Sequence, residues 1–196
     1  MRWRLVPIAA AVLLAGAPPA HAHLMNSGFG PFYDGLAHPL VVAEDLLPIL
    51  ALALLGGLGG ARRGRSVLFA LTLSWVAGMA AARLVVGIAP PVWWTGVGTI
   101  LPGALVAADR RLPLGLAAGL AAVVGATHGL GNGRELATVA GGAVATVGVA
   151  CALFTLASLV AGQVAVLRAP WARIVVRVAG SWIAAIGLLM LGWALR

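Results

Sequence analysis

Charged residues and cysteine are both scarce in this 196-residue sequence. Charged side chains make up 9% of it and hydrophobic ones 62%, a balance that excludes an ordinary soluble domain and indicates a protein whose solvent is lipid. The single cysteine, Cys151, lies in an apolar run, and one thiol excludes both an internal disulfide and a cluster of thiolate ligands. Lysine is absent, so the net charge of +8 comes from arginine alone.

The distribution of the arginines argues against nucleic acid as a partner. A nucleic-acid binder would gather them on one face of a soluble domain. Here they lie in short groups between apolar runs, where a membrane protein keeps its cytoplasmic anchors. The groups expected on the cytoplasmic side comprise Arg62, Arg63, Arg65, Arg110, Arg111, Arg168 and Arg173.

The amino terminus has the three regions of a secretory signal. Arg2 and Arg4 precede a short apolar run at 5–16, and Ala20-His21-Ala22 forms a small-residue cleavage site. We therefore expect residues 1–22 to be a signal peptide and residues 23–196 to be a single transmembrane domain whose amino terminus lies outside the cytoplasm. The alternative is an uncleaved first helix.

Six later apolar runs are each near the roughly 20 residues that a helix needs to cross a bilayer. We expect an all-α fold, a polytopic bundle of about six transmembrane helices in the bacterial inner (cytoplasmic) membrane. The arginine-poor connections at Pro90-Pro91 and 127–135 are expected to face outward. The pairs Gly56/Gly60, Gly115/Gly119 and Gly125/Gly129, each with a spacing of four residues, are expected to let helices pack closely. The runs cover residues 41–58, 67–88, 92–108, 112–130, 136–166 and 174–193.

Almost all the acidic and histidine side chains fall on the outer side of this layout. His38 is followed by Pro39, which predicts a helix start, and Asp45 comes seven residues later, on the same face of such a helix. Glu44 and Asp45 would then lie within the apolar zone, where a charge costs at least about 2 kcal/mol unless it is paired, hydrated or bound to a cation. Such residues are candidates for function.

Imidazole and carboxylate ligands together suit a divalent transition-metal ion. The convergence of His38, Asp45 and His128 would make a metal site if their helices are neighbours. The alternative is structural: His38 caps a helix, the carboxylates pair with Arg83 or Arg134, and His128 lies at the membrane interface. The candidate metal ligands are His38, Glu44, Asp45, His128, Asp34 and His23, the last as a new amino terminus after signal cleavage.

The segment His38-Pro-Leu-Val-Val-Ala-Glu-Asp-Leu-Leu resembles the His-Pro-x-x-Gly-x-Asp-His-Leu-Leu signature of the HupE/UreJ family, hydrogenase and urease accessory membrane proteins. Thr127-His128-Gly129 with Glu135 is similar to a later motif of the same family. The resemblance implies six helices, a nickel or cobalt permease or metal-supplying accessory protein, and a site built from His38, Glu44 and His128. In this chain Val42 replaces the signature glycine, and Glu44-Asp45 replaces its Asp-His pair.

The function expected is therefore uptake of a divalent transition metal of nickel or cobalt type, or its supply to metalloenzyme maturation factors as partners. We expect the ion to be the substrate and expect no organic cofactor and no enzymatic activity. Two alternatives stay open, an intramembrane metal-dependent hydrolase and a non-transporting accessory or anchor protein. A nucleotide-driven pump is not indicated, because the glycine-rich segment 56–60 lacks the Lys-Ser or Lys-Thr of a phosphate-binding loop.

Overall fold

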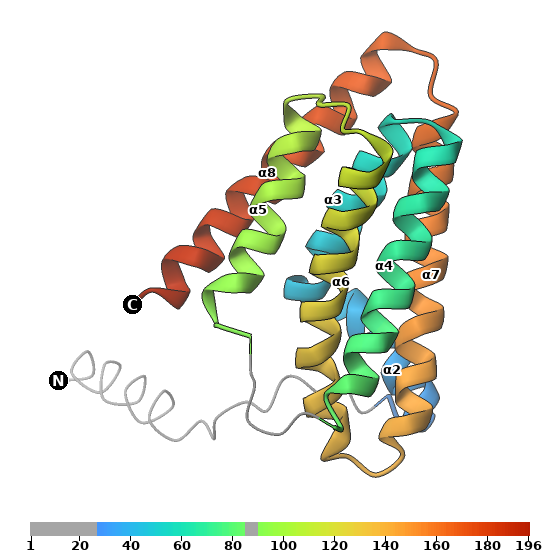
Figure 1. Ribbon diagram of the computed structural model, residues 1–196, viewed down its shortest axis with the longest axis vertical. Helices are drawn as coiled ribbons and strands as arrows, with labels where there is room; N and C mark the ends of the chain where they lie inside the picture. The colour runs from blue at the N-terminus through green and yellow to red at the C-terminus, as the bar shows by residue number, and fades with distance from the viewer. Residues whose placement is uncertain (1–26, 85–89) are drawn as a thin grey trace, which may run out of the picture.

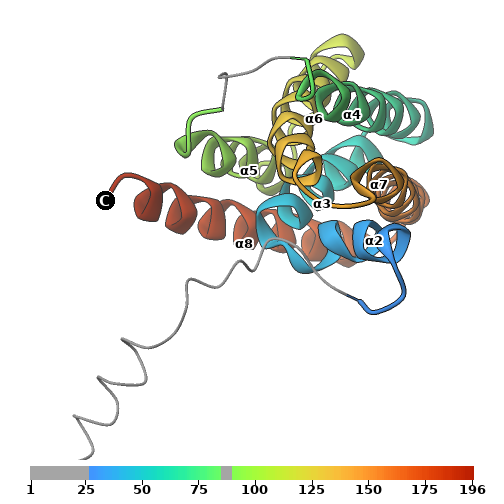
Figure 2. The same ribbon diagram turned by 90° about the horizontal axis from the view of Figure 1, so that it is seen from below.

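The computed structural model describes residues 27–84 and 90–196, and all the regular secondary structure in these two ranges is helical. The expected signal peptide and His23 lie outside the described residues. The helices form an elongated bundle in which α3 is surrounded by its neighbours (Figures 1 and 2). The helices are α2 (Pro31–Val41), α3 (Ala43–Leu58), α4 (Ala61–Ala81), α5 (Trp93–Ala107), α6 (Leu114–Ala137), α7 (Gly142–Ala165) and α8 (Pro170–Ala194).

Four helices, α4, α6, α7 and α8, are long and apolar enough to cross a membrane. The pair α2 and α3 passes the same test together as one broken span, which raises the number to five. The apolar helix α5 has 15 residues, which gives it a length of about 22 Å against a hydrocarbon thickness of about 30 Å. The all-helical membrane fold is thus confirmed with four to five candidate spans.

The predicted helix start at His38 is wrong. α2 already begins at Pro31 and carries His38 in its last turn, and the chain then bends by 70° before α3 begins at Ala43. Val42, at the bend, has an extended backbone. Pro39 lacks the N–H that would bond to the carbonyl of Gly35, so the helix is weakened where it ends. His38 and Asp45 therefore lie on different helices and meet because the chain bends, not because they share one helical face.

The polar segment 127–135, expected as an outward-facing connection, is part of a helix. α6 continues without interruption to Ala137, and the connection to α7 comprises only residues 138–141, with Gly141 in the left-handed conformation (φ 77°). The segment is polar because several of its side chains line an internal site between helices. A hydropathy pattern alone does not distinguish such a segment from a loop.

Close packing of α6 on α4 positions the site. As expected from their spacing, Gly125 and Gly129 face α4, and an added methyl group at Gly129 would overlap the carbonyl of Trp75. The close packing expected at Gly115 and Gly119 is wrong, because an added methyl group at either position would meet no atom within 4 Å. Gly133, one turn further, lies against Met79 in the same way. These glycines let the two backbones approach closely, so the indole of Trp75 reaches side chains on α6.

The two ends of the bundle differ in charge. At one end, called here the arginine-rich end, lie the connections α3–α4, α5–α6 and α7–α8 (Figure 1). Asp109 in the α5–α6 connection accepts two hydrogen bonds of 2.7 Å from Arg173 and thereby ties that connection to α8. The opposite end, the acidic end, carries α2 and the α6–α7 connection. Its acidic side chains are Asp34, Glu44, Asp45 and Glu135.

Candidate functional site

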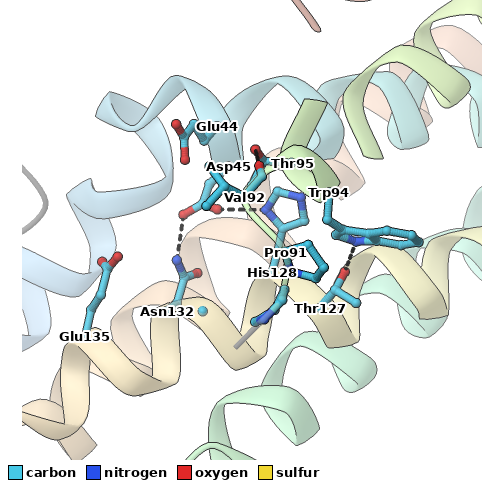
Figure 3. Close-up of a pocket in the computed structure, with 12 residues that line it drawn as sticks. Glu44, Asp45, Pro91, Val92, Trp94, Thr95, Thr127, His128, Asn132 and Glu135 are labelled. Carbon is cyan, nitrogen blue, oxygen red and sulfur yellow. Dashed lines mark hydrogen bonds and ion pairs between the residues drawn. The ribbon is translucent and has the colours of Figure 1, made fainter. Parts of the chain in front are cut away.

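The carboxylate of Asp45 is the centre of a buried polar cluster (Figure 3). Asp45 is only 3% exposed and lies in the first turn of α3, where the helix dipole favours a negative charge. Its Oδ1 atom is 3.1 Å from Nδ1 of His128, and its Oδ2 atom accepts a 2.9 Å hydrogen bond from Nδ2 of Asn132. Nε2 of His38 lies 3.3 Å from the same Oδ2 atom. Two helices, α2 and α6, thus contribute partners to one carboxylate on α3.

Asn132 connects the side chains of the cluster, and the sequence did not identify it as a site residue. Nε1 of Trp75 donates a 2.8 Å hydrogen bond to Oδ1 of Asn132, which fixes the orientation of the amide. The amide nitrogen therefore faces Asp45, and it also lies 3.3 Å from Nε2 of His38. A signal was present in the sequence, because Asn132 follows His128 by four residues and so shares its helical face.

His128 uses only one of its two ring nitrogens. An ionised carboxylate can only accept hydrogen bonds, so Nδ1, which contacts Asp45, carries a proton, and Nε2 has a free lone pair whenever the imidazole is neutral. Nε2 is buried and has no hydrogen-bond partner, although the ring packs against Trp75 with centroids 5.2 Å apart. A buried polar atom without a partner costs about 1–3 kcal/mol. A water molecule or an ion would satisfy such an atom.

A pocket with a volume of 280 Å³ leads to this cluster. Its walls come from α3, α6 and the start of α5, and Figure 3 shows the imidazole of His128 between Asp45 and Trp94. Nε1 of Trp94 donates a 2.6 Å hydrogen bond to the hydroxyl of Thr127 and so joins α5 to α6 beside His128. The polar side chains in the lining are Glu44, Asp45, Thr95, Thr127, His128, Asn132 and Glu135.

The structure brings together three of the six side chains proposed as metal ligands: His38, Asp45 and His128. Glu44 is exposed and lines the same pocket without contacting the cluster. Asp34 lies on α2, where it accepts a 2.6 Å hydrogen bond from the backbone N–H of Ser27 and lines a separate cavity of 40 Å³ together with His38. The sixth, His23, lies outside the described residues.

The cluster is a hydrogen-bonded network and not a preformed cage for an ion. Among residues 27–84 and 90–196, no three His, Cys, Asp or Glu side chains are arranged to hold a metal ion together. The reason is that Asp45 lies between the two imidazoles and contacts both of them. The donor atom left open in the network is Nε2 of His128.

Among the described residues, no arginine forms an ion pair with Glu44 or Asp45, as the alternative would require. Within the described ranges, the ion-pair partners of Asp45 are the two histidines, and the arginine–carboxylate pair joins Arg173 to Asp109 at the opposite end. The buried carboxylate is therefore stabilised by two imidazoles and an amide.

Comparison with known proteins identifies the family of this chain. No curated protein and no solved structure matched it. The family model described as HupE / UreJ protein matches residues 10–190, which include all the side chains of the cluster and nearly the whole bundle. This match over most of its length shows that the chain belongs to the HupE/UreJ family.

Proposed function

We propose that this protein carries a divalent transition-metal ion of nickel or cobalt type across the membrane, for supply to metalloenzyme maturation. The observation that supports the proposal is Nε2 of His128, a buried nitrogen without a partner beside a pocket that contains two further carboxylates. Membership of the HupE/UreJ family, whose proteins are linked to nickel and cobalt supply, agrees with this substrate class.

The chemistry of the cluster fits an ion in transit. Nδ1 of His128 donates to Asp45, and a carboxylate in this position orients the imidazole and raises its basicity as a ligand. Imidazole nitrogen suits nickel and cobalt better than magnesium or calcium. A transported ion must bind well enough to enter and weakly enough to leave. One open imidazole, with other ligand positions filled by water or by displaced hydrogen-bonding groups, meets both requirements.

The charge distribution supports transport of the ion from the outside toward the cytoplasm. In our proposal the arginine-rich end lies in the cytoplasm, in agreement with the positive-inside rule. The acidic end then faces outward with the mature amino terminus, and Glu44 and Glu135 attract cations toward the pocket that they line. In this topology α5 is a short sixth span of the inner membrane. The signal peptide is cleaved after residue 22.

The proposal is tested with the purified full chain in proteoliposomes that contain a metal-sensitive dye. Addition of Ni²⁺ or Co²⁺ outside is expected to produce dye quenching with the wild type and none with Asp45→Asn or His128→Ala. Asp109→Asn is the matched control, because it neutralises a carboxylate at the arginine-rich end, away from the pocket. Thermal stability with and without each ion is measured in parallel, since a ligand that binds the native state raises its stability.

The outcomes separate the alternatives. Uptake that requires Asp45 and His128 supports transport through the cluster. Ion-dependent stabilisation without uptake would indicate a metal-supplying accessory protein that does not transport. If neither ion stabilises the protein or enters the vesicles, or if all three substitutions act alike, the proposed function is wrong.

A further inference from the structure

Gly98 on α5 lies opposite the open nitrogen of the cluster. A Cβ atom at this position would stand 3.4 Å from Nε2 of His128 and 3.8 Å from the nearest methyl carbon of Val124, and these are the closest atoms that it would meet. The missing side chain therefore leaves a gap about the size of a methyl group. One wall of the gap is a nitrogen and the rest is apolar.

The nitrogen that faces this gap is deeply buried. His128 is 5% exposed, and its Nε2 atom has no hydrogen-bond partner. Burial without a hydrogen bond is unfavourable for this nitrogen, so we expect it to bind a cation that reaches it. The gap in front of it is the immediate space into which such a cation would move.

The gap lies about one helical turn beyond the pocket, toward the arginine-rich end. Gly98 lies about one helical turn after Thr95, which lines the pocket, and Val124 lies about one turn before His128. α5 runs toward the arginine-rich end and α6 runs away from it, so both steps lead in the same direction (Figure 1). Gly98 and Val124 therefore lie just beyond His128, on the side toward the arginine-rich end.

We propose that Gly98 is an access-determining residue: by leaving open the space before Nε2 of His128, it lets the ion bind that nitrogen and continue inward. The inference rests on the proposed function and adds to it a residue from a helix that carries no ligand. Gly98 contributes space, and His128 contributes the donor atom.

A methyl group at position 98 would exclude the ion without disturbing the helices. An ion bound to imidazole lies about 2.0–2.1 Å from the nitrogen, so a methyl group and an ion compete for the same gap. A carbon at 3.4 Å from Nε2 makes only an ordinary contact with the surrounding atoms. Alanine is also a better helix former than glycine, so folding is not expected to suffer.

The test compares Gly98→Ala with the wild type in the Ni²⁺ and Co²⁺ proteoliposome assay and in thermal melts without metal. We expect an unchanged or higher melting temperature and a loss of uptake of about tenfold or more, as one additional carbon often costs in a fitted site. Gly119→Ala on α6 is the control, because its added Cβ would meet no atom within 4 Å. Gly98→Ala with Val124→Ala, which removes the facing methyl groups, is expected to recover part of the uptake.

The outcomes distinguish this inference from the proposed function. Normal uptake by a folded Gly98→Ala protein, with uptake still lost in Asp45→Asn, would overturn the role of Gly98 and leave the transport site intact. Absence of uptake by the wild type would overturn both. If Gly98→Ala does not fold, the single variant Val124→Ala provides the test. Its wider gap is expected to raise the uptake of the larger Cd²⁺ relative to that of Ni²⁺. An unchanged ratio of Cd²⁺ uptake to Ni²⁺ uptake would overturn the inference.

Discussion

The hydrogen bond between Trp75 and Asn132 gives the sharpest test of the network. Trp75 is fully buried, and its 2.8 Å hydrogen bond orients the amide that supports Asp45. Trp75→Phe removes the donor and leaves Oδ1 of Asn132 buried without a partner. Asn132→Leu removes the acceptor and leaves the indole N–H unpaired. Each orphaned group costs about 1–3 kcal/mol in a buried site.

The double variant leaves neither group orphaned, so its loss of stability is expected to be smaller than the sum of the two single losses. Interhelical hydrogen bonds in membrane proteins have measured coupling energies of about 0.6 kcal/mol on average and up to about 1.7 kcal/mol. We expect a value near the upper limit, because both side chains are buried. Asn132→Leu is also expected to cost more than Trp75→Phe, since it removes a donor to the carboxylate of Asp45.

The assay is reversible unfolding in mixed detergent and dodecyl sulfate micelles, followed by circular dichroism for the wild type, both single variants and the double variant. Trp182→Phe serves as the control for a tryptophan replacement, because Trp182 is 68% exposed on α8. Strict additivity of the two single effects would refute the claim that these side chains act as a pair. A loss for Trp182→Phe equal to that for Trp75→Phe would refute the assignment of the effect to the buried site.

Two further predictions concern the rest of the bundle. The Arg173 guanidinium holds the pKa of Asp109 below its ordinary value of 3.8, so the stability from this pair is complete above that pH and is lost as the pH falls through the lowered pKa. The difference in melting temperature between wild type and Asp109→Asn should therefore shrink as the pH is lowered from 7 to well below 3.8, and a constant difference would contradict this. Gly129→Ala is expected to cost about 1–3 kcal/mol because the methyl group overlaps the α4 backbone. Gly119→Ala should cost nothing in the same unfolding assay, and equal effects would show that α4 and α6 do not pack closely there.

The candidate site shows which residues local sequence patterns identify and which they miss. His38, Asp45 and His128 were identified because ionisable groups in apolar surroundings are costly and therefore stand out in a sequence. The argument that joined His38 to Asp45 through one helix was wrong, since α2 ends and the chain bends by 70° between them. Asn132 and Trp75 were missed because an amide and an indole carry no charge and so do not stand out as ionisable groups do.

The sequence by itself determined the solvent, the helical class and the family of this protein, because composition, run length and a short His-Pro motif are local properties. Only the tertiary structure decided which side chains meet. The contact of His128 with Asp45 spans 83 residues of sequence, and that of Trp75 with Asn132 spans 57. The gap at Gly98 depends on how α5 lies against α6. No local pattern encodes the relative placement of helices, which results from the packing of the whole bundle in its membrane.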